Sequence, residues 1–89
     1  MKLCKIVGKC WSTVKDEQLT GSKFLLAREI LNSGELKAEF IIAIDELGAA
    51  EGDTVIITEG EAVFNFISGN KPIDSVIIAI VEGYSVKDK

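Results

Sequence analysis

The sequence predicts an all-β fold, a small and partly open barrel of five short strands that assembles into an oligomer. A chain of 89 residues forms one domain at most, residues 1–89. Apolar and β-branched runs alternate with clusters of Gly, Asn, Asp and Ser, which is typical of a β protein. Hydrophobic residues make up 47% of the chain, more than so small a domain buries by itself. We therefore expect self-association.

These runs predict five strands, at residues 2–14, 23–31, 37–44, 54–58 and 75–81. Gly8 lies in the middle of the first run and indicates a bend or a close approach of another backbone. Residues 15–22 are polar and are expected to form a loop. Turn-forming residues at 32–35 join the second and third strands into a hairpin.

The second half of the chain combines a loop, a short helix and a strand that is apolar on both faces. Gly48 and Gly52 bracket the loop, which implies unusual φ angles or tight backbone contacts there. Apolar residues at helical spacing predict an α-helix of about two turns over residues 61–67. So small a helix cannot cover a whole sheet face, and a neighbouring copy is expected to cover the second face of residues 75–81.

Charge and residue types exclude several classes of function. The formal net charge of −4 and the pI near 4.7 argue against a protein whose main partner is a polyanion. The chain has no His and its two cysteines are Cys4 and Cys10, which excludes zinc sites of the Cys/His type and His-based acid–base chemistry within one chain. On a regular strand the two thiols share a face about 20 Å apart, too far for a disulfide. We interpret them as buried residues of a cytosolic protein that has no signal peptide and no membrane span.

The motifs of catalysis and cofactor binding are also missing. The segment between Gly48 and Gly52 lacks the lysine and the spacing of a phosphate-binding loop. The nearby acidic residues do not have the spacing of a calcium loop; they are Asp45, Glu46, Glu51 and Asp53. The serines have no general base near them in the sequence. We therefore expect no catalytic residues, no cofactor and no metal.

A nucleic-acid-binding module is the main alternative function, and an enzyme or metal-dependent regulator, ranked below it, would need a site assembled between subunits from Asp45, Glu51 and Asp53. Residues 1–28 carry a balance of +4 and the remainder −8. On a regular first strand Lys5, Lys9 and Trp11 share a face with Leu3 and Val7, and a cationic strand with an aromatic residue could bind single-stranded nucleic acid in the manner of an OB-fold. At this overall charge we favour lysines that face solvent or pair with acidic groups of an adjacent subunit, and a Trp11 in an interface or core.

Four segments together resemble the EutN/CcmL family of bacterial microcompartment vertex proteins. They occur in the family's order and spacing, at residues 5–15, 19–26, 43–55 and 72–81. The resemblance implies a five-stranded OB-like barrel with one short α-helix that forms a homopentamer. It also implies a structural function at the vertices of a polyhedral shell, among hexameric shell proteins, with no catalytic activity. We expect this shell to lie in the cytoplasm, and we expect no nucleic-acid partner and no membrane.

Two departures from the family pattern concern single segments. Ala50 replaces the middle glycine of the family's Gly-Ala-Gly-x-Gly loop, which has no energetic cost unless that residue needs a positive φ. Residues 61–65 replace the small residues and the Arg that are usual after Gly60. Contacts made by those family residues are therefore not expected here.

In a head-to-tail ring of five subunits, the candidate functional residues are those near the five-fold axis and those at the interface between subunits. The loop expected near the five-fold axis consists of Gly48, Ala49, Ala50, Glu51 and Gly52. A ring of Glu51 carboxylates around a narrow opening there would disfavour anions. The residues expected at the interface between subunits are Trp11, Lys15, Lys23, Asp45, Val76, Ile78 and Ile80.

Overall fold

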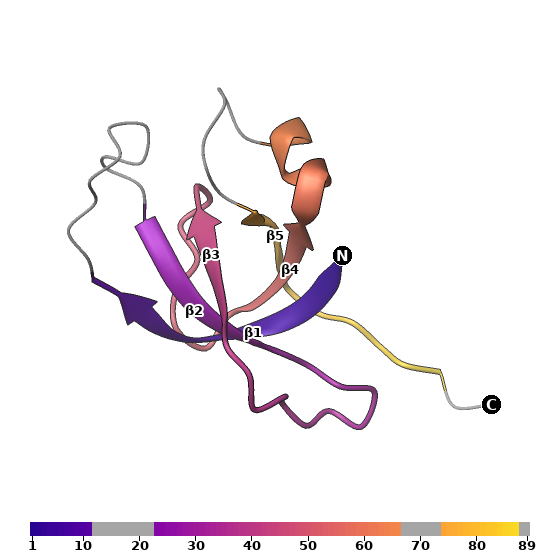
Figure 1. Ribbon diagram of the computed structural model, residues 1–89. Helices are drawn as coiled ribbons and strands as arrows, with labels where there is room; N and C mark the ends of the chain where they lie inside the picture. Colours follow the sequence, from indigo (N-terminus) through magenta and orange to yellow (C-terminus); the bar gives the residue numbers. More distant parts are fainter. Residues whose placement is uncertain (12–22, 67–73, 88–89) are drawn as a thin grey trace.

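The five strands form a closed barrel in a computed structural model, which describes residues 1–11, 23–66 and 74–87. In chain order the elements are β1 (Lys2–Cys10), β2 (Lys23–Glu29), β3 (Ile41–Asp45), β4 (Thr54–Glu59), the helix η2 (Gly60–Asn65) and β5 (Ser75–Val81). Figure 1 shows the strands wrapped around one interior, with η2 at one end of the barrel. The predicted all-β class with five strands is confirmed, although the ring is closed rather than partly open.

The order of strands around the barrel is β1-β2-β3-β5-β4. All neighbouring pairs are antiparallel except β3 and β5, which pair in parallel at Ile44 and Val76. The pairs β1–β2 and β2–β3 are sequential, whereas β1–β4 and β3–β5 join distant parts of the chain. The closure of the barrel is therefore a long-range feature.

Two predicted elements differ in extent or type. The third strand begins at Ile41 rather than at residue 37, because bends at residues 38 and 39 interrupt the pairing that starts with the isolated bridge between Ile30 and Leu36. The predicted α-helix is instead a 3₁₀-helix of six residues. Glu59, the N-cap residue before it, makes no side-chain hydrogen bond to the helix. At three residues per turn, these six residues make two turns of 3₁₀-helix. Residues 12–14 of the first predicted strand, the loop 15–22 and Ile67 lie outside the described ranges.

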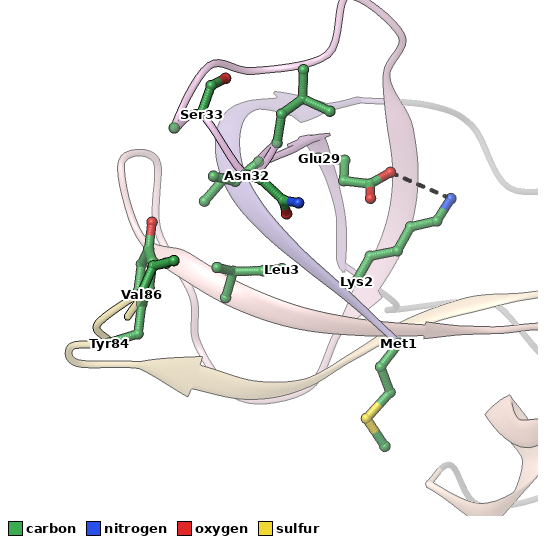
Figure 2. Close-up of a pocket in the computed structure, with 11 residues that line it drawn as sticks. Met1, Lys2, Leu3, Glu29, Asn32, Ser33, Tyr84 and Val86 are labelled. Carbon is green, nitrogen blue, oxygen red and sulfur yellow. Dashed lines mark ion pairs between the residues drawn. The ribbon is translucent and has the colours of Figure 1, made fainter. Parts of the chain in front are cut away.

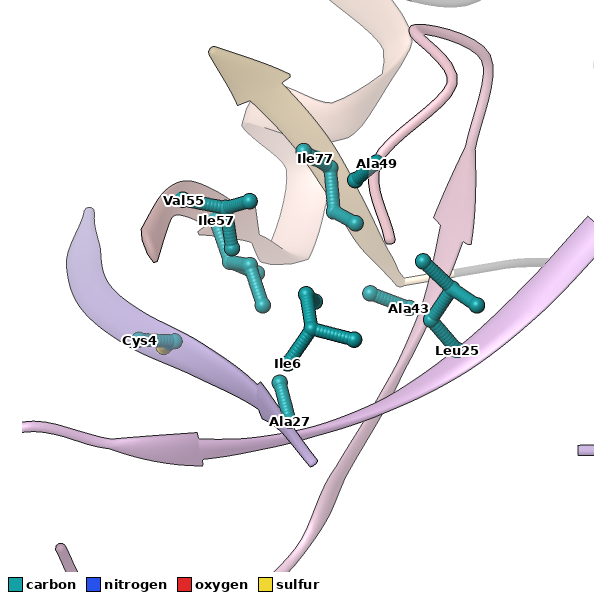
Figure 3. Packing of buried hydrophobic residues seen from close by; sticks show 9 residues of the cluster. All are labelled: Cys4, Ile6, Leu25, Ala27, Ala43, Ala49, Val55, Ile57 and Ile77. Carbon is teal, nitrogen blue, oxygen red and sulfur yellow. The ribbon is translucent and has the colours of Figure 1, made fainter. Parts of the chain in front are cut away.

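The main core fills the inside of the barrel. Figure 3 shows its side chains converging from the strands and from the loop after β3. Its members are at most 2% exposed, and they are Cys4, Ile6, Leu25, Ala27, Ala43, Ala49, Val55, Ile57 and Ile77. Their alternation along the strands explains why the sequence pattern identified these strands.

A second, smaller core lies between the outside of the sheet and η2. Val63 of η2 packs with Ile44 and Val76, and all three are at most 1% exposed. Phe24 and Ile78 pack against this group from its edge. Part of the cover expected from a neighbouring copy on the second face of β5 thus comes from within the chain.

A β-bulge at Val7 changes which residues of β1 face inward. Ile6 pairs with Ala27 and Gly8 with Leu26, so Val7 is an extra residue in the ladder. Directly opposite residues of an antiparallel pair share a face. Lys5 pairs with Arg28 and Lys9 with the buried Leu25. The expectation that Lys5 and Lys9 share a face is therefore wrong.

The same bulge separates the two cysteines. Cys4 is buried in the core of the barrel. Cys10 lies beyond the bulge, pairs with Phe24 and is partly exposed. The two thiols lie on opposite faces of β1, which corrects the expectation from a regular strand. Both are free cysteines, but the expectation that both are buried holds for Cys4 alone and is wrong for Cys10.

Candidate functional site

The loop after β3 is held by the side chain of Asp45, whose carboxylate is fully buried. One carboxylate oxygen accepts a hydrogen bond from the N–H of Leu47 at 2.9 Å, and the other accepts one from the N–H of Ala49 at 2.8 Å. The ammonium of Lys23 lies 3.4 Å from the same carboxylate and donates to the carbonyl of Ala49 at 3.0 Å. The loop is thereby tied to two adjacent strands.

A tight turn over residues 50–53 completes the loop. The N–H of Asp53 donates to the carbonyl of Ala50 at 3.0 Å, and the Asp53 side chain accepts from the N–H of Ala50 at 2.9 Å. Gly52 has a φ of +94°, which suits the third position of a type II turn and which residues with side chains rarely adopt. Ile6 of β1 holds the turn by accepting from Gly52 and donating to Asp53.

The backbone explains the alanine that departs from the family pattern. Among the described residues positive φ angles occur at glycines alone, and in this loop those are Gly48 and Gly52. Ala50 has no positive φ, so an alanine there causes no strain. Ala49 is fully buried in the main core, which leaves Gly48, Ala50, Glu51 and Gly52 as the exposed residues of the predicted axial loop.

The predicted interface residues that the structure describes fall into three groups. Trp11 is 86% exposed and Ile80 is 38% exposed, so both are open to a neighbouring copy. Ile78 is partly buried, and Val76 is buried within its own chain in the cluster that contains Val63 of η2. Lys23 and Asp45 pair with each other inside the subunit. Lys15 lies outside the described ranges.

Other exposed apolar residues were not predicted as candidates. Phe40 and Ile42 lie before and in β3 and are 62% and 54% exposed. Tyr84 and Val86 follow β5 and are 54% and 68% exposed. The alternation of polar and apolar residues after residue 81 was the signal that could have drawn attention to the last two.

A chain of ion pairs crosses one end of the barrel. The Lys2 ammonium lies 3.0 Å from Glu59 and 3.8 Å from Glu29, and Lys37 lies 3.4 Å from the same oxygen of Glu29. The hydrogen bond to Glu59, followed by the charge of that carboxylate, raises the pKa of Lys2. Close by, burial raises the pKa of the Cys4 thiol to about 11, and the negative charge of Glu29 adds to the effect.

A pocket of about 380 Å³ lies between this end of the barrel and the segment after β5. Figure 2 shows Leu3 and Lys2 of β1 on one side, Asn32 and Ser33 above, and Tyr84 with Val86 opposite. Across residues 1–11, 23–66 and 74–87 no cluster of potential ligands is suited to a metal ion. Within the same part of the chain no helix is long and apolar enough to span a membrane.

Comparison with known proteins places the chain among shell proteins. The family model described as "Ethanolamine utilisation protein EutN/carboxysome" matches residues 1–82. The carboxysome shell vertex protein CcmL of Thermosynechococcus vestitus is 35% identical over 86 residues, which cover 96% of this chain and 87% of that protein. The bacterial microcompartment shell vertex protein PduN of Salmonella typhimurium is 34% identical over 90 residues, with coverages of 96% and 99%.

Solved structures agree with this placement. The pentameric microcompartment shell protein GrpN of Rhodospirillum rubrum superposes with a TM-score of 0.86 at 26% identity, covering 99% of this chain and 100% of that one. CcmL of Nostoc sp. PCC 7120 superposes with a TM-score of 0.87 at 30% identity, covering 94% and 92%. With the closed five-stranded barrel and the family match over nearly the whole chain, the protein belongs to the EutN/CcmL family.

Proposed function

We propose that this chain is a structural subunit of a bacterial microcompartment shell, that it forms homopentamers, and that the pentamers close the shell's vertices among hexameric shell proteins. The observation that carries the proposal is the match to vertex proteins over most of this chain and most of each relative. A pentameric relative also has a similar fold. A lattice of six-fold tiles lies flat, and five-fold elements supply the curvature that closes it. The function is then one of geometry, and no catalytic activity is assigned to the subunit.

Several features of the subunit support assembly into a ring. Large apolar side chains remain open on different parts of the isolated subunit, among them Trp11, Phe40, Ile42 and Val86. A head-to-tail ring needs two different patches on each copy, because each interface joins unlike surfaces. A stable interface buries on the order of 1,200 Å² or more, so surfaces of this kind are required.

The exposed part of the loop after β3 is the candidate for the five-fold axis. Glu51 occupies the second position of the turn over residues 50–53 and is exposed. Asp45 accepts hydrogen bonds from the loop before this turn, and the turn itself is bonded to the backbone of Ile6, so the loop is held in one position, as a narrow opening would require. Five Glu51 carboxylates at the axis would disfavour the passage of anions. A pentamer structure with Glu51 on the outer rim would contradict this placement.

The nucleic-acid alternative required a cationic strand face with an aromatic residue. The bulge at Val7 places Lys5 and Lys9 on opposite faces of β1. The strand face on which that function depended is therefore not formed.

Native mass spectrometry tests the proposal directly. We expect one dominant species at five times the 9.6 kDa subunit mass. When the chain is co-expressed with hexameric shell proteins, electron microscopy should show closed shells, and omission of the chain should leave open or extended assemblies. A protein that stays monomeric at every concentration, or shells that close equally well without it, would refute the proposal.

A further inference from the structure

The segment after β5, residues 82–87, has the pattern of a half-buried strand but is not buried. Its apolar residues Tyr84 and Val86 alternate with Gly83, Ser85 and Lys87. Alternation with a period of two is typical of a strand that packs on one face. In the subunit Tyr84 and Val86 stay 54% and 68% exposed. We call residues 82–87 the tail segment.

The tail segment does not pack closely on its own barrel. Figure 1 shows it running away from the strands after β5. Between its apolar side chains and Leu3 of β1 lies the pocket of about 380 Å³. In the described part of the chain no hydrogen bond or ion pair joins residues 83–87 to the barrel. The buried face that the sequence pattern implies must therefore be covered by something outside the subunit.

The outer face of β2 and β3 offers an exposed apolar surface. Leu26 pairs with Ile42 across these strands, and Ile42 is 54% exposed. Phe40, just before β3, is 62% exposed. Gly8 pairs with Leu26 from the other side and has no side chain, which leaves this face open. We call Leu26, Phe40 and Ile42 the β2–β3 face.

Charge adds a second match between the two surfaces. Lys5 of β1 and Arg28 of β2 stand opposite each other on the outer side of the sheet, and Arg28 lies two residues after Leu26. Two cations therefore border the β2–β3 face. The tail segment begins with Glu82, which lies two residues before Tyr84. In an extended chain Glu82, Tyr84 and Val86 point to the same side. One side of the tail segment thus presents a carboxylate followed by two apolar groups.

We propose that, in the ring, the tail segment of each subunit lies across the β2–β3 face of the next copy, with Tyr84 and Val86 against Ile42 and Phe40 and with Glu82 beside Lys5 and Arg28. The proposal rests on the proposed pentamer and specifies the two unlike surfaces that a head-to-tail interface requires. It also explains why these four apolar side chains are exposed in the isolated subunit.

Dilution measurements on single variants provide the first test. Tyr84→Ser and Ile42→Ser each remove an apolar group that is exposed in the subunit, so the barrel should keep its fold while assembly weakens. We expect each to raise the protomer concentration at half-assembly by about tenfold or more, as for a central interface residue. Ser85→Asn changes the opposite side of the tail segment and should leave that concentration within about twofold. Equal effects of all three variants, or none, would overturn the proposal.

Photo-crosslinking gives a test that does not depend on how much a variant weakens the assembly. Tyr84→p-benzoylphenylalanine is prepared in ¹⁴N and ¹⁵N forms, mixed under assembling conditions, irradiated and mapped by mass spectrometry. We expect crosslinks between differently labelled chains, at peptides that contain Leu26 or residues 40–42. A pentamer whose crosslinks stay within one chain, or reach another surface, would overturn this inference and leave the proposed function intact. A chain that remains monomeric would overturn both.

Discussion

Lys23 and Asp45 stand opposite each other on β2 and β3, with the lysine ammonium 3.4 Å from the buried carboxylate. This carboxylate also accepts hydrogen bonds from the N–H groups of Leu47 and Ala49, and the lysine donates to the carbonyl of Ala49. A cross-strand ion pair therefore determines the path of the loop that is the candidate for the five-fold axis. Lys23 and Asp45 were predicted to lie at the interface between subunits, but they pair with each other within one subunit.

Replacement of Asp45 should destabilise the subunit more than replacement of Lys23. Asp45→Ala leaves the N–H of the buried Ala49 without an acceptor, and we expect a loss of about 2–4 kcal/mol in the free energy of unfolding. Lys23→Met should cost about 1 kcal/mol, because the lysine is 45% exposed and the carboxylate keeps its two backbone donors. Urea unfolding at a fixed protomer concentration measures both. A larger loss for Lys23→Met would contradict this account of the loop.

Substitution of Gly52 should strain the turn over residues 50–53. Its φ of +94° is unfavourable for any residue with a side chain, so we expect Gly52→Ala to lower the free energy of unfolding by about 1–2 kcal/mol. Gly8→Ala is the matched control, because Gly8 has no positive φ and an added methyl group would lie 3.6 Å from Leu26, an ordinary contact. The control should be neutral or slightly stabilising. Thermal unfolding of the two variants, measured side by side, tests whether the added side chain causes strain at Gly52.

Arg28 should hold the β2–β3 connection against the barrel. Its guanidinium donates to the carbonyls of Lys37 and Leu36. Arg28→Lys keeps the charge but loses the two-pronged geometry, so the amides of Leu31 and Lys37 should exchange with solvent about tenfold faster. Hydrogen exchange measured by NMR reports this change. Lys5→Met, on the residue opposite Arg28, is the control, and similar acceleration there would show that the guanidinium is not responsible.

The raised pKa of Cys4 should appear as a loss of stability at alkaline pH. Burial favours the neutral thiol, so the pKa is about 11 in the folded chain against an ordinary value of 9.0. The stabilisation is fully present below pH 9 and is lost as pH rises through 11, because the unfolded chain releases this proton first. We expect the free energy of unfolding to fall by about 2–3 kcal/mol over this window.

Other groups also titrate at alkaline pH, so the contribution of Cys4 is obtained by difference. Cys4→Ala removes the thiol and should show a correspondingly flatter decline of the free energy of unfolding between pH 9 and 11. Parallel curves for the two proteins would contradict the assignment. Alkylation should agree: Cys4 should resist iodoacetamide at pH 8 in the native protein and react in denaturant.

Much of the fold was open to prediction from local patterns. The β-branched runs identified all five strands, because residues that alternate between core and solvent leave that alternation in the sequence. The glycines around the loop after β3 were recognised from their type alone, and their positive φ angles confirm the reading. Whether Ala50 is strained depended on its φ, and the structure shows that this φ is not positive.

Other features depend on contacts between distant residues. The bulge at Val7 is a property of the pairing between β1 and β2, and it reverses which side chains of β1 face inward beyond that point. A regular alternation read from the sequence therefore assigned Lys9 and Cys10 to the wrong faces. The role of Asp45 was missed for a similar reason, because its donors come from a loop whose path the composition does not specify.

The sequence by itself determined the class of fold, the number of strands and the excess of apolar surface, since each of these follows from composition and short-range alternation. Tertiary structure alone decided that the ring closes through the parallel pairing of Ile44 with Val76, and that η2 covers part of the outer sheet. It also decided which apolar side chains remain exposed for assembly. The physical reason is that pairing and burial depend on residues far apart in the chain, whose meeting is set by the packing of the whole domain.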